Sequence, residues 1–373
     1  MNILVQLSHP AHFHLYKNAI KNWQDNGHQV HVLIKTKDIL EELCQNSQIP
    51  YHNILPIAHR KSKLGVLWDM LVRDWKIFWF CRNHNIDILT GSTPEVAHVS
   101  KILGLYSVNT GEDDMAVIPA FARVAGPFFQ TILSPFVCDN GKYNSKSIKY
   151  PGYQKLAYLH PNYFTPSRQI VEGYGIDLSK PYFILRFASL NAHHDDGVQG
   201  INTTVAQRLV DILKPYGQIY ISSERKLEPQ FEPYCLRINP LDIHHLLAFA
   251  SLYIGDSQSM AVEACMLGTP CLRFNDFVGQ KKISVLEELE HVYHLTNGIH
   301  SSDADTLYKR IDEILALSDA RAVYQSRRQQ MLHDKIDVTK FWTWFLENYP
   351  ASAVQHAEND DFWQQFGTEA ATV

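Results

Sequence analysis

The sequence between residues 252 and 273 predicts a strand, a short polar turn, a helix and a second strand. Three polar residues occupy the start of that helix: Ser257, Gln258 and Ser259. Backbone N–H groups at a helix start have no partner within the helix, and the helix dipole favours negative charge there. We therefore expect this position, beyond the carboxyl end of a parallel strand, to bind an anion such as a diphosphate.

Glu263 follows Ser259 by four residues, so both side chains lie on one face of the predicted helix. A carboxylate behind a bound diphosphate can accept two hydrogen bonds from the hydroxyl groups of a ribose. The alternative is an ordinary helix, capped by Asp256 or Ser257, with Glu263 in solvent. Turn chemistry alone leaves the two interpretations equally open.

Three histidines, His9, His12 and His14, follow the strand predicted at residues 2–7. Such a cluster can bind a metal, but Pro10 interrupts it and no Asp-His pair follows, so we expect no metal site. A histidine with a pKa near 6.5 can instead take a proton from a hydroxyl group. We expect His12, and after it His14, to be this base. A histidine that caps or packs the first helix is the alternative.

Three carboxylates, Glu112, Asp113 and Asp114, follow the strand predicted at residues 105–109. Because ligands bind beyond the carboxyl ends of parallel strands, these residues would face the same cleft as the histidines. Glu112 or Asp113 could orient a histidine or bind sugar hydroxyls. Acidic residues also favour the first turn of a helix, so a capping role is equally open.

Further residues border the predicted binding region. Arg186 ends a predicted strand, and its planar guanidinium suits a bidentate contact with phosphate. Pro240 and Leu241 precede a helix and would edge the pocket of a nucleotide base. Arg273 and Asn275 end the strand after Glu263 and could reach a sugar.

Short apolar segments alternate with amphipathic helices along the whole chain. Strands are expected at residues 2–7, 29–34, 51–55, 86–90, 105–109 and 130–133, and again at 182–187, 218–222, 235–238, 252–254 and 271–274. The histidines at positions 244 and 245 are interpreted as the start of a helix. This alternation predicts an α/β protein with two Rossmann-like, doubly wound domains that face each other across a cleft.

The domain limits follow from the same pattern. Residues 1–150 would form an N-terminal acceptor domain, and residues 151–335 a C-terminal nucleotide-binding domain. An aromatic helix at residues 336–350 is expected to cross back onto the first domain. Residues 351–373 are polar and rich in small side chains, so we expect a flexible tail.

Composition limits the possible functions. The 373 residues include 34 Lys and Arg against 39 Asp and Glu, a net charge of −5, which argues against a general nucleic-acid binder. No stretch approaches the roughly 18 apolar residues of a membrane helix, and the N-terminus does not resemble a signal peptide. The six cysteines form no CxxC pair. These features fit a cytoplasmic protein with reduced thiols.

Two amphipathic segments, residues 64–82 and 117–136, raise the question of a membrane. The first combines an aromatic stripe with Arg73, Lys76 and Arg82. Either segment could dock a lipid-linked acceptor or the inner membrane surface. Core packing is the simpler explanation and the one we favour from the sequence.

The segment from Gly255 to Pro270 reads Gly-Asp-Ser-Gln-Ser-x3-Glu-Ala-x3-Gly-Thr-Pro. It resembles the nucleotide-sugar signature of the GT-B superfamily, above all the Asp-Ser-Gly-Gly-x3-Glu motif of non-hydrolysing UDP-GlcNAc 2-epimerases. Leu-Ser-His-Pro-Ala-His-Phe-His at residues 7–14 and Asp-Val-Thr-Lys-Phe-Trp-Thr-Trp-Phe at residues 337–345 are similar to a narrower microbial family of GT-B-like proteins, a domain of unknown function. The resemblance covers most of residues 1–350.

This resemblance implies two Rossmann-like domains, with a nucleotide diphosphate sugar held by the second. Residues 257–259 would meet the diphosphate, and Glu263 the ribose. The epimerases also imply a catalytic role for Glu112 and a phosphate contact for His193 or His194. Gln258 and Ser259 replace the glycine pair of the epimerase motif, so side chains stand where bare backbone approaches phosphate.

The combined prediction is a metal-independent glycosyltransferase without a cofactor. It would transfer a sugar from a UDP-linked donor to a glycan or lipid-linked acceptor in surface polysaccharide biosynthesis. An epimerase that uses Glu112 with His193 or His194 as proton carriers is the second hypothesis. A non-catalytic binder of sugar nucleotides or glycans is the third.

Overall fold

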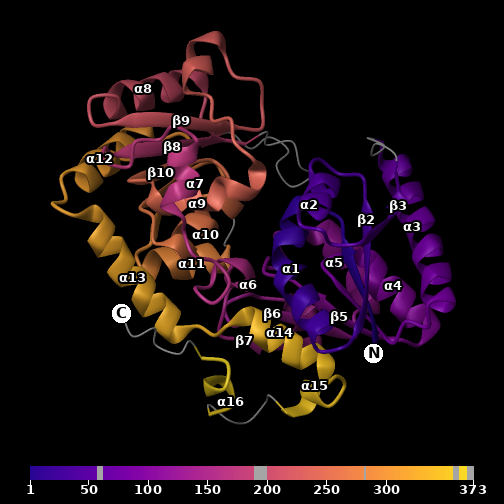
Figure 1. Cartoon of the computed structure of the whole chain (residues 1–373). Helices are drawn as coiled ribbons and strands as arrows, with labels where there is room; N and C mark the ends of the chain where they lie inside the picture. The colour runs from indigo at the N-terminus through magenta and orange to yellow at the C-terminus, as the bar shows by residue number, and fades with distance from the viewer. Residues whose placement is uncertain (57–61, 189–199, 281–282, 356–360, 368–373) are drawn as a thin grey trace. The chain divides into compact units, whose positions relative to one another are not determined.

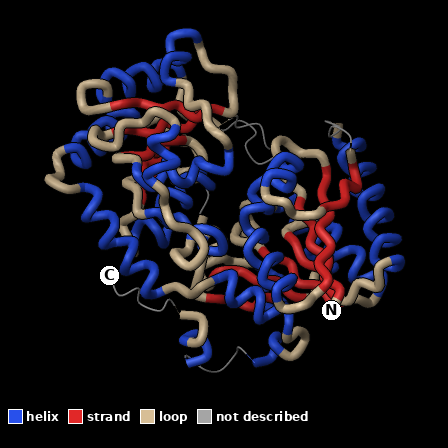
Figure 2. Tube along the Cα trace, viewed as in Figure 1, coloured by secondary structure: helices blue, strands red, loops and turns tan. Residues whose placement is uncertain are grey.

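The computed structural model describes residues 1–56, 62–188, 200–280, 283–355 and 361–367. The chain divides into two compact units (Figures 1 and 2). Met1–Tyr163 and Lys335–Val373 form the first unit, and Phe164–Asp334 form the second. Each unit is a parallel sheet flanked by helices, so the predicted α/β class with two doubly wound sheets is confirmed.

The first unit is built on a seven-stranded sheet of order β3-β2-β1-β4-β5-β6-β7. Its strands are β1 (Asn2–Leu7), β2 (Gln29–Lys35), β3 (Tyr51–Leu55), β4 (Ile88–Gly91), β5 (Tyr106–Thr110), β6 (Thr131–Pro135) and β7 (Ser147–Tyr150). The helices that flank it are α1 (Pro10–Asp25), α2 (Leu40–Asn46), α3 (Lys63–Asn83), α4 (Pro94–Leu103), α5 (Pro119–Ala125) and α6 (Leu156–Leu159). Strand order reverses between β1 and β4, which is where open α/β sheets place their ligands.

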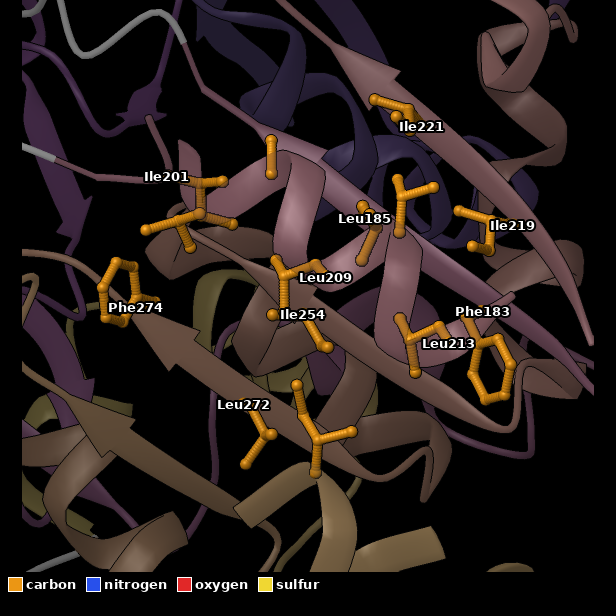
Figure 3. Close-up of a cluster of buried hydrophobic side chains, with 14 of the residues drawn as sticks. Phe183, Leu185, Ile201, Leu209, Leu213, Ile219, Ile221, Ile254, Leu272 and Phe274 are labelled. Atoms are coloured by element: carbon orange, nitrogen blue, oxygen red, sulfur yellow. The ribbon is translucent and has the colours of Figure 1, made fainter. Parts of the chain in front are cut away.

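The second unit contains a five-stranded sheet of order β12-β11-β10-β8-β9. Its strands are β8 (Tyr182–Phe187), β9 (Gln218–Ser223), β10 (Leu252–Gly255), β11 (Cys271–Phe274) and β12 (Thr296–Ile299). Its helices are α7 (Arg168–Gly173), α8 (Thr203–Leu213), α9 (Ile243–Phe249), α10 (Gln258–Leu267), α11 (Ser284–His291), α12 (Ala304–Leu315) and α13 (Ala320–Asp334). Figure 3 shows side chains of β8, β9, β10, β11 and α8 packed into one core, and their burial stabilises this sheet.

The chain beyond residue 335 packs within the first unit. Helix α14 (Val338–Glu347) lies against α1, where Asn22 Nδ2 donates to Thr343 Oγ1 at 3.3 Å, and Thr339 Oγ1 donates to the Ala157 carbonyl at 2.7 Å. Two short helices follow, α15 (Ser352–Gln355) and α16 (Asp361–Gln364). Phe366 is buried and its carbonyl accepts from the Asp337 N–H at 2.8 Å, so part of the segment expected to be a flexible tail is packed.

Helix α3 corrects one expectation from the sequence. We favoured core packing for its aromatic stripe, but six large apolar side chains of α3 are exposed, whereas its polar residues Asp69 and Arg73 are buried. The second amphipathic segment behaves as expected, since Phe129 and Met115 belong to a buried cluster with α5. The exposed side of α3 therefore requires a separate explanation.

Candidate functional site

The carboxyl ends of three strands of the second unit lie level with one another. In the sheet register, Gly255 of β10 pairs with Arg186 of β8 on one side and with Arg273 of β11 on the other. A Cβ atom on Gly255 would lie 2.8 Å from Cβ of Arg186, so this row of strands requires a glycine in its centre. Helix α10 begins three residues later, directly beyond this edge.

Helix α10 starts at Gln258, with Ser257 as its capping residue in an extended conformation. Ser257 Oγ accepts from the Met260 N–H at 3.4 Å. Ser259 is exposed, while Ser257 and Gln258 are half-buried. The first turn therefore presents backbone N–H groups and the positive end of the helix dipole near the carboxyl edge of the sheet, as predicted for an anion site.

The side chain of Gln258 is held by a buried polar network. Its Oε1 accepts from Arg273 Nη1 at 3.2 Å, and its Nε2 donates to Asn275 Oδ1, also at 3.2 Å. Arg273 Nη2 in turn lies 2.8 Å from Glu290 Oε2. Because Arg273 and Asn275 are buried and already paired, the structure places them beneath the start of α10, where they position Gln258. The expected direct contact of both residues with a sugar has no support in this arrangement.

Glu263 lies one turn into α10 and is partnered by a histidine. Its Oε1 lies 3.2 Å from Nε2 of His244, and the side chain of Glu263 is the more exposed of the two. His244 is the second residue of α9, which follows the short 3-10 turn Pro240–Asp242. This contact brings the turn with Pro240 and Leu241 close to the carboxylate predicted to bind ribose.

Sequence reasoning did not identify His244 as a site residue. It was interpreted only as a helix-start residue, and the structure instead shows it beside Glu263. No periodicity or motif connects α9 with α10, since the contact depends on how the two helices pack. The adjacent His245 has a different role, because its Nδ1 accepts from the Ser167 N–H at 3.1 Å.

Arg186 ends β8 as predicted, but its guanidinium already has partners on the neighbouring strand. Nη1 donates to Ser222 Oγ at 2.6 Å, and Nη2 forms an ion pair with Glu224. A phosphate contact would therefore require Arg186 to exchange one of these partners. His193 and His194, the other predicted phosphate contacts, lie outside the described residues.

Asp256 is buried at the end of β10 and joins two separated parts of the chain. Its Oδ1 accepts from the Ala188 N–H at 2.6 Å, and its Oδ2 accepts from the Ile201 N–H at 3.2 Å. Burial raises the pKa of Asp256 to about 6, although both N–H donors oppose this shift. Asp256 is therefore a structural brace, and Ser257 alone supplies the side-chain cap of α10.

The pKa of Asp256 leads to a pH-dependent prediction. Because the folded-state pKa of about 6 exceeds the ordinary value of 3.8, the contribution of Asp256 to stability falls as the pH rises from about 4 to about 6. Relative to an Asp256→Asn variant, the wild type should lose on the order of 2 kcal/mol across this window. Hydrogen exchange of the β8 and β10 amides, compared between both proteins at each pH, measures the difference. A difference that does not change with pH would contradict the assignment.

The loop after β1 holds the histidines of the first unit. His9 caps α1 through Nδ1, which accepts from the Ala11 N–H at 3.2 Å. His12 is half-buried, and its Nδ1 accepts from the Ser8 N–H at 3.3 Å. Burial, together with the nearby charges of His9, Lys35 and Lys155, lowers the pKa of His12 to about 3. The imidazole of His12 is therefore neutral near pH 7.

His14 has the surroundings of a packing residue. It is buried on α1, and its ring lies 5.4 Å from the ring of Tyr158 on α6. Phe13 contacts the same ring edge-on. Of the two histidines predicted as a base, His12 therefore has the accessible position.

Glu112, after β5, is fixed by the segment that precedes α6. Its Oε1 lies 2.5 Å from Nζ of Lys155, and its Oε2 accepts from the Gln154 N–H at 2.7 Å. The hydrogen bond of His12 goes to Ser8, so in the described residues neither Glu112 nor Asp113 holds the imidazole directly. Lys155 connects the two positions, because it pairs with Glu112 and also lowers the pKa of His12. Asp113 itself is exposed.

Two general searches concern the described residues only. They contain no group of three His, Cys, Asp or Glu side chains that could hold a metal ion. They also contain no helix with the length and apolarity that crossing a membrane requires.

Comparison with known proteins identifies the fold. No family model matches the sequence, and no curated protein matches it. Among solved structures, a putative UDP-N-acetylglucosamine 2-epimerase from Listeria monocytogenes matches with a TM-score of 0.67 and 12% identity, over 96% of this chain and 97% of that one. The UDP-GlcNAc 2-epimerase from Neisseria meningitidis, bound to UDP-GlcNAc, matches with a TM-score of 0.61 and 13% identity, over 88% of this chain and all of that one.

A glycosyltransferase matches over a similar length. The spinosyn rhamnosyltransferase SpnG, complexed with spinosyn aglycone, has a TM-score of 0.60 and 15% identity, over 93% of this chain and all of its own. The chain has the GT-B fold. At identities of 11–15%, these matches establish the GT-B architecture predicted from the sequence and leave the reaction undecided.

Proposed function

We propose that this chain is a GT-B glycosyltransferase that uses a UDP-linked sugar as donor. Its acceptor would be a glycan or a lipid-linked sugar, as in surface polysaccharide assembly. The observation that carries the proposal is the start of α10, where Ser257, Gln258 and Ser259 follow the carboxyl end of β10, and Glu263 stands one turn further beside His244. This arrangement offers separate contacts for a diphosphate and a ribose.

In this proposal the second unit, with residues 164–334, binds the donor. N–H groups in the first turn of α10 would bind the diphosphate, and the helix dipole would stabilise the negative charge that develops as UDP leaves. The network of Arg273, Asn275 and Glu290 keeps Gln258, and with it the first turn, in one orientation. A helix terminus oriented in advance is effective because it need not reorganise during the reaction.

The first unit would bind the acceptor and supply the base. An acceptor oxygen attacks the anomeric carbon, the bond from that carbon to the diphosphate oxygen breaks, and the acceptor proton passes to Nε2 of His12. For this role the imidazole must carry its resting proton on Nδ1, which now accepts from Ser8. At 3.3 Å that contact is long, so releasing it costs little.

A UDP-GlcNAc 2-epimerase is the second candidate. It is favoured by the TM-score of 0.67 with the Listeria protein and by the placement of Glu112 at the carboxyl end of β5, beside Lys155. An epimerase needs no acceptor, because it eliminates the nucleotide and adds it back to the other face of the sugar.

Incubation with UDP-GlcNAc alone distinguishes these reactions. We expect NMR in D2O to show no change of configuration at C2 of the sugar and no deuterium incorporation there. Epimerisation would overturn the transferase proposal in favour of the second candidate. Calorimetry provides the prior check, since failure to bind UDP or any UDP-sugar would exclude both enzymes and leave a different ligand class.

A further inference from the structure

Helix α3 of the first unit carries its apolar side chains on the outside. Six of them are between 45% and 82% exposed and recur at three- and four-residue steps, which places them on one side of the helix. This apolar stripe consists of Leu64, Leu67, Trp68, Leu71, Trp75 and Trp79. Its first turns border a shallow hollow of about 460 Å³ that also includes Ser62 and Gly65. Exposed apolar patches of this extent usually mark an interaction surface.

The inner side of α3 shows that this orientation is specific. Nε and Nη2 of Arg73 both lie 2.6 Å from Glu95 Oε1 on α4, and both side chains are buried. Gln6 Nε2 donates to the other oxygen of Glu95 at 3.4 Å. Ile77 and Cys81 complete the inner side, in the core above the sheet. Rotating α3 to bury the stripe would expose these apolar groups and break a buried ion pair, which is strongly destabilising.

Charges around the stripe are separated by sign. On α3, α4 and α5, which pack side by side, the acidic residues Asp69 and Glu95 are buried, and Asp74 pairs with His98. The exposed charged residues of these three helices are cationic: Arg82, Lys101 and Arg123. Figure 1 shows α3 beside α4 in this layer. An aromatic stripe bordered only by positive charge complements an anionic, apolar partner.

We propose that the apolar stripe of α3 docks this protein onto an anionic lipid bilayer. The stripe spans about 22 Å along the helix, at 1.5 Å per residue. Its three tryptophans suit the boundary between headgroups and acyl chains, and the surrounding cations suit acidic headgroups. A second copy of this face is a poorer partner, because a symmetric contact would bring like charges together. The choice of a lipid partner deepens the proposed function, since a lipid-linked acceptor would be presented at such a surface.

Vesicle co-sedimentation of the full chain tests this proposal. Wild type should bind phosphatidylcholine vesicles that contain phosphatidylglycerol, and binding should weaken at high salt. The double variant Trp68→Ser, Trp75→Ser should bind about tenfold more weakly or less, as expected from the lost apolar contacts. Both positions are more than half exposed, so folding should be retained. Tyr216→Ser with Val292→Ser, equally exposed in the second unit, is the matched control and should bind like wild type.

Tryptophan emission gives an independent readout. All seven tryptophans belong to the first unit, and three of them lie on the stripe, so a blue shift on vesicle addition reports on this unit alone. Unchanged binding by the tryptophan variant, or no binding of wild type to either vesicle, would overturn the proposal. A wild-type dimer in sedimentation velocity that this variant dissociates would assign the stripe to self-association instead. UDP binding of the tryptophan variant should remain at the wild-type level, so this result is separable from failure of the proposed function.

Discussion

His12→Ala should lower the rate of UDP release from a UDP-sugar by a factor of about 100 to 10,000, the usual contribution of a general base. The affinity for UDP should remain close to that of wild type. His12 lies at the carboxyl end of β1, where strand order reverses, and it is the accessible histidine of its loop. His14 packs against Tyr158 and cannot replace it without repacking α1. Coupled detection of UDP, with water or the acceptor as nucleophile, measures the rate.

The control for this variant is His9→Ser in the same loop. His9 caps α1, and serine is also a good cap, so the helix start should persist and the rate should stay near wild type. The pH dependence adds a second test. Because the pKa of His12 is lowered to about 3, the ring is neutral from pH 5 to pH 8. The ratio of wild-type to His12→Ala rates should therefore be constant over this range. A ratio that falls below pH 6.5, or turnover retained in His12→Ala, would remove His12 as the base.

Glu263→Ala should weaken UDP binding by about 1–3 kcal/mol, or roughly 5- to 150-fold, because two hydrogen bonds from ribose hydroxyls to a charged acceptor are lost. The carboxylate is available for this role, since it is half-buried on the same helix as the proposed diphosphate contacts. Titration calorimetry with UDP measures the affinity. Glu313→Ala on α12, which also removes a paired glutamate, is the matched control and should bind UDP normally.

A double comparison isolates the ribose contact from indirect effects on His244. UDP and its 2′,3′-dideoxy analogue should differ in affinity for wild type and should bind Glu263→Ala equally well. The coupling between the side chain and the hydroxyl groups is then the quantity measured. If the loss of both hydroxyl groups costs the same in wild type and variant, Glu263 does not contact ribose, and its role is to hold His244 in place.

Most strands and helices that build the fold could be predicted from the sequence. Continuous apolar segments identified β1 and β8 with correct limits, and helical periodicity did the same for α4. The strand expected at residues 235–238 is wrong, because only Cys235 forms an isolated bridge, to Ile221. Strands β7 and β12 were missed since each has four residues, with polar groups between apolar ones. Short segments of this kind carry too little periodicity to be distinguished from turns.

The site was predictable in its local part and not in its long-range part. The start of α10 follows from a strand, a polar turn and a helix that are adjacent in sequence. The pairing of Glu263 with His244, and that of Arg186 with Glu224, depends on packing between elements distant in sequence. Orientation of α3 was mispredicted for a related reason. Apolar periodicity shows that a helix has two unlike sides, but only the buried Arg73 and Glu95 pair determines which side faces the sheet.

A crystal structure of this protein soaked with UDP tests the central claim most directly. We predict that phosphate oxygens lie within hydrogen-bond distance of backbone N–H groups at residues 257–259, with the ribose hydroxyls on the carboxylate of Glu263. Binding of the nucleotide away from α10, or with its ribose remote from Glu263, would contradict the account.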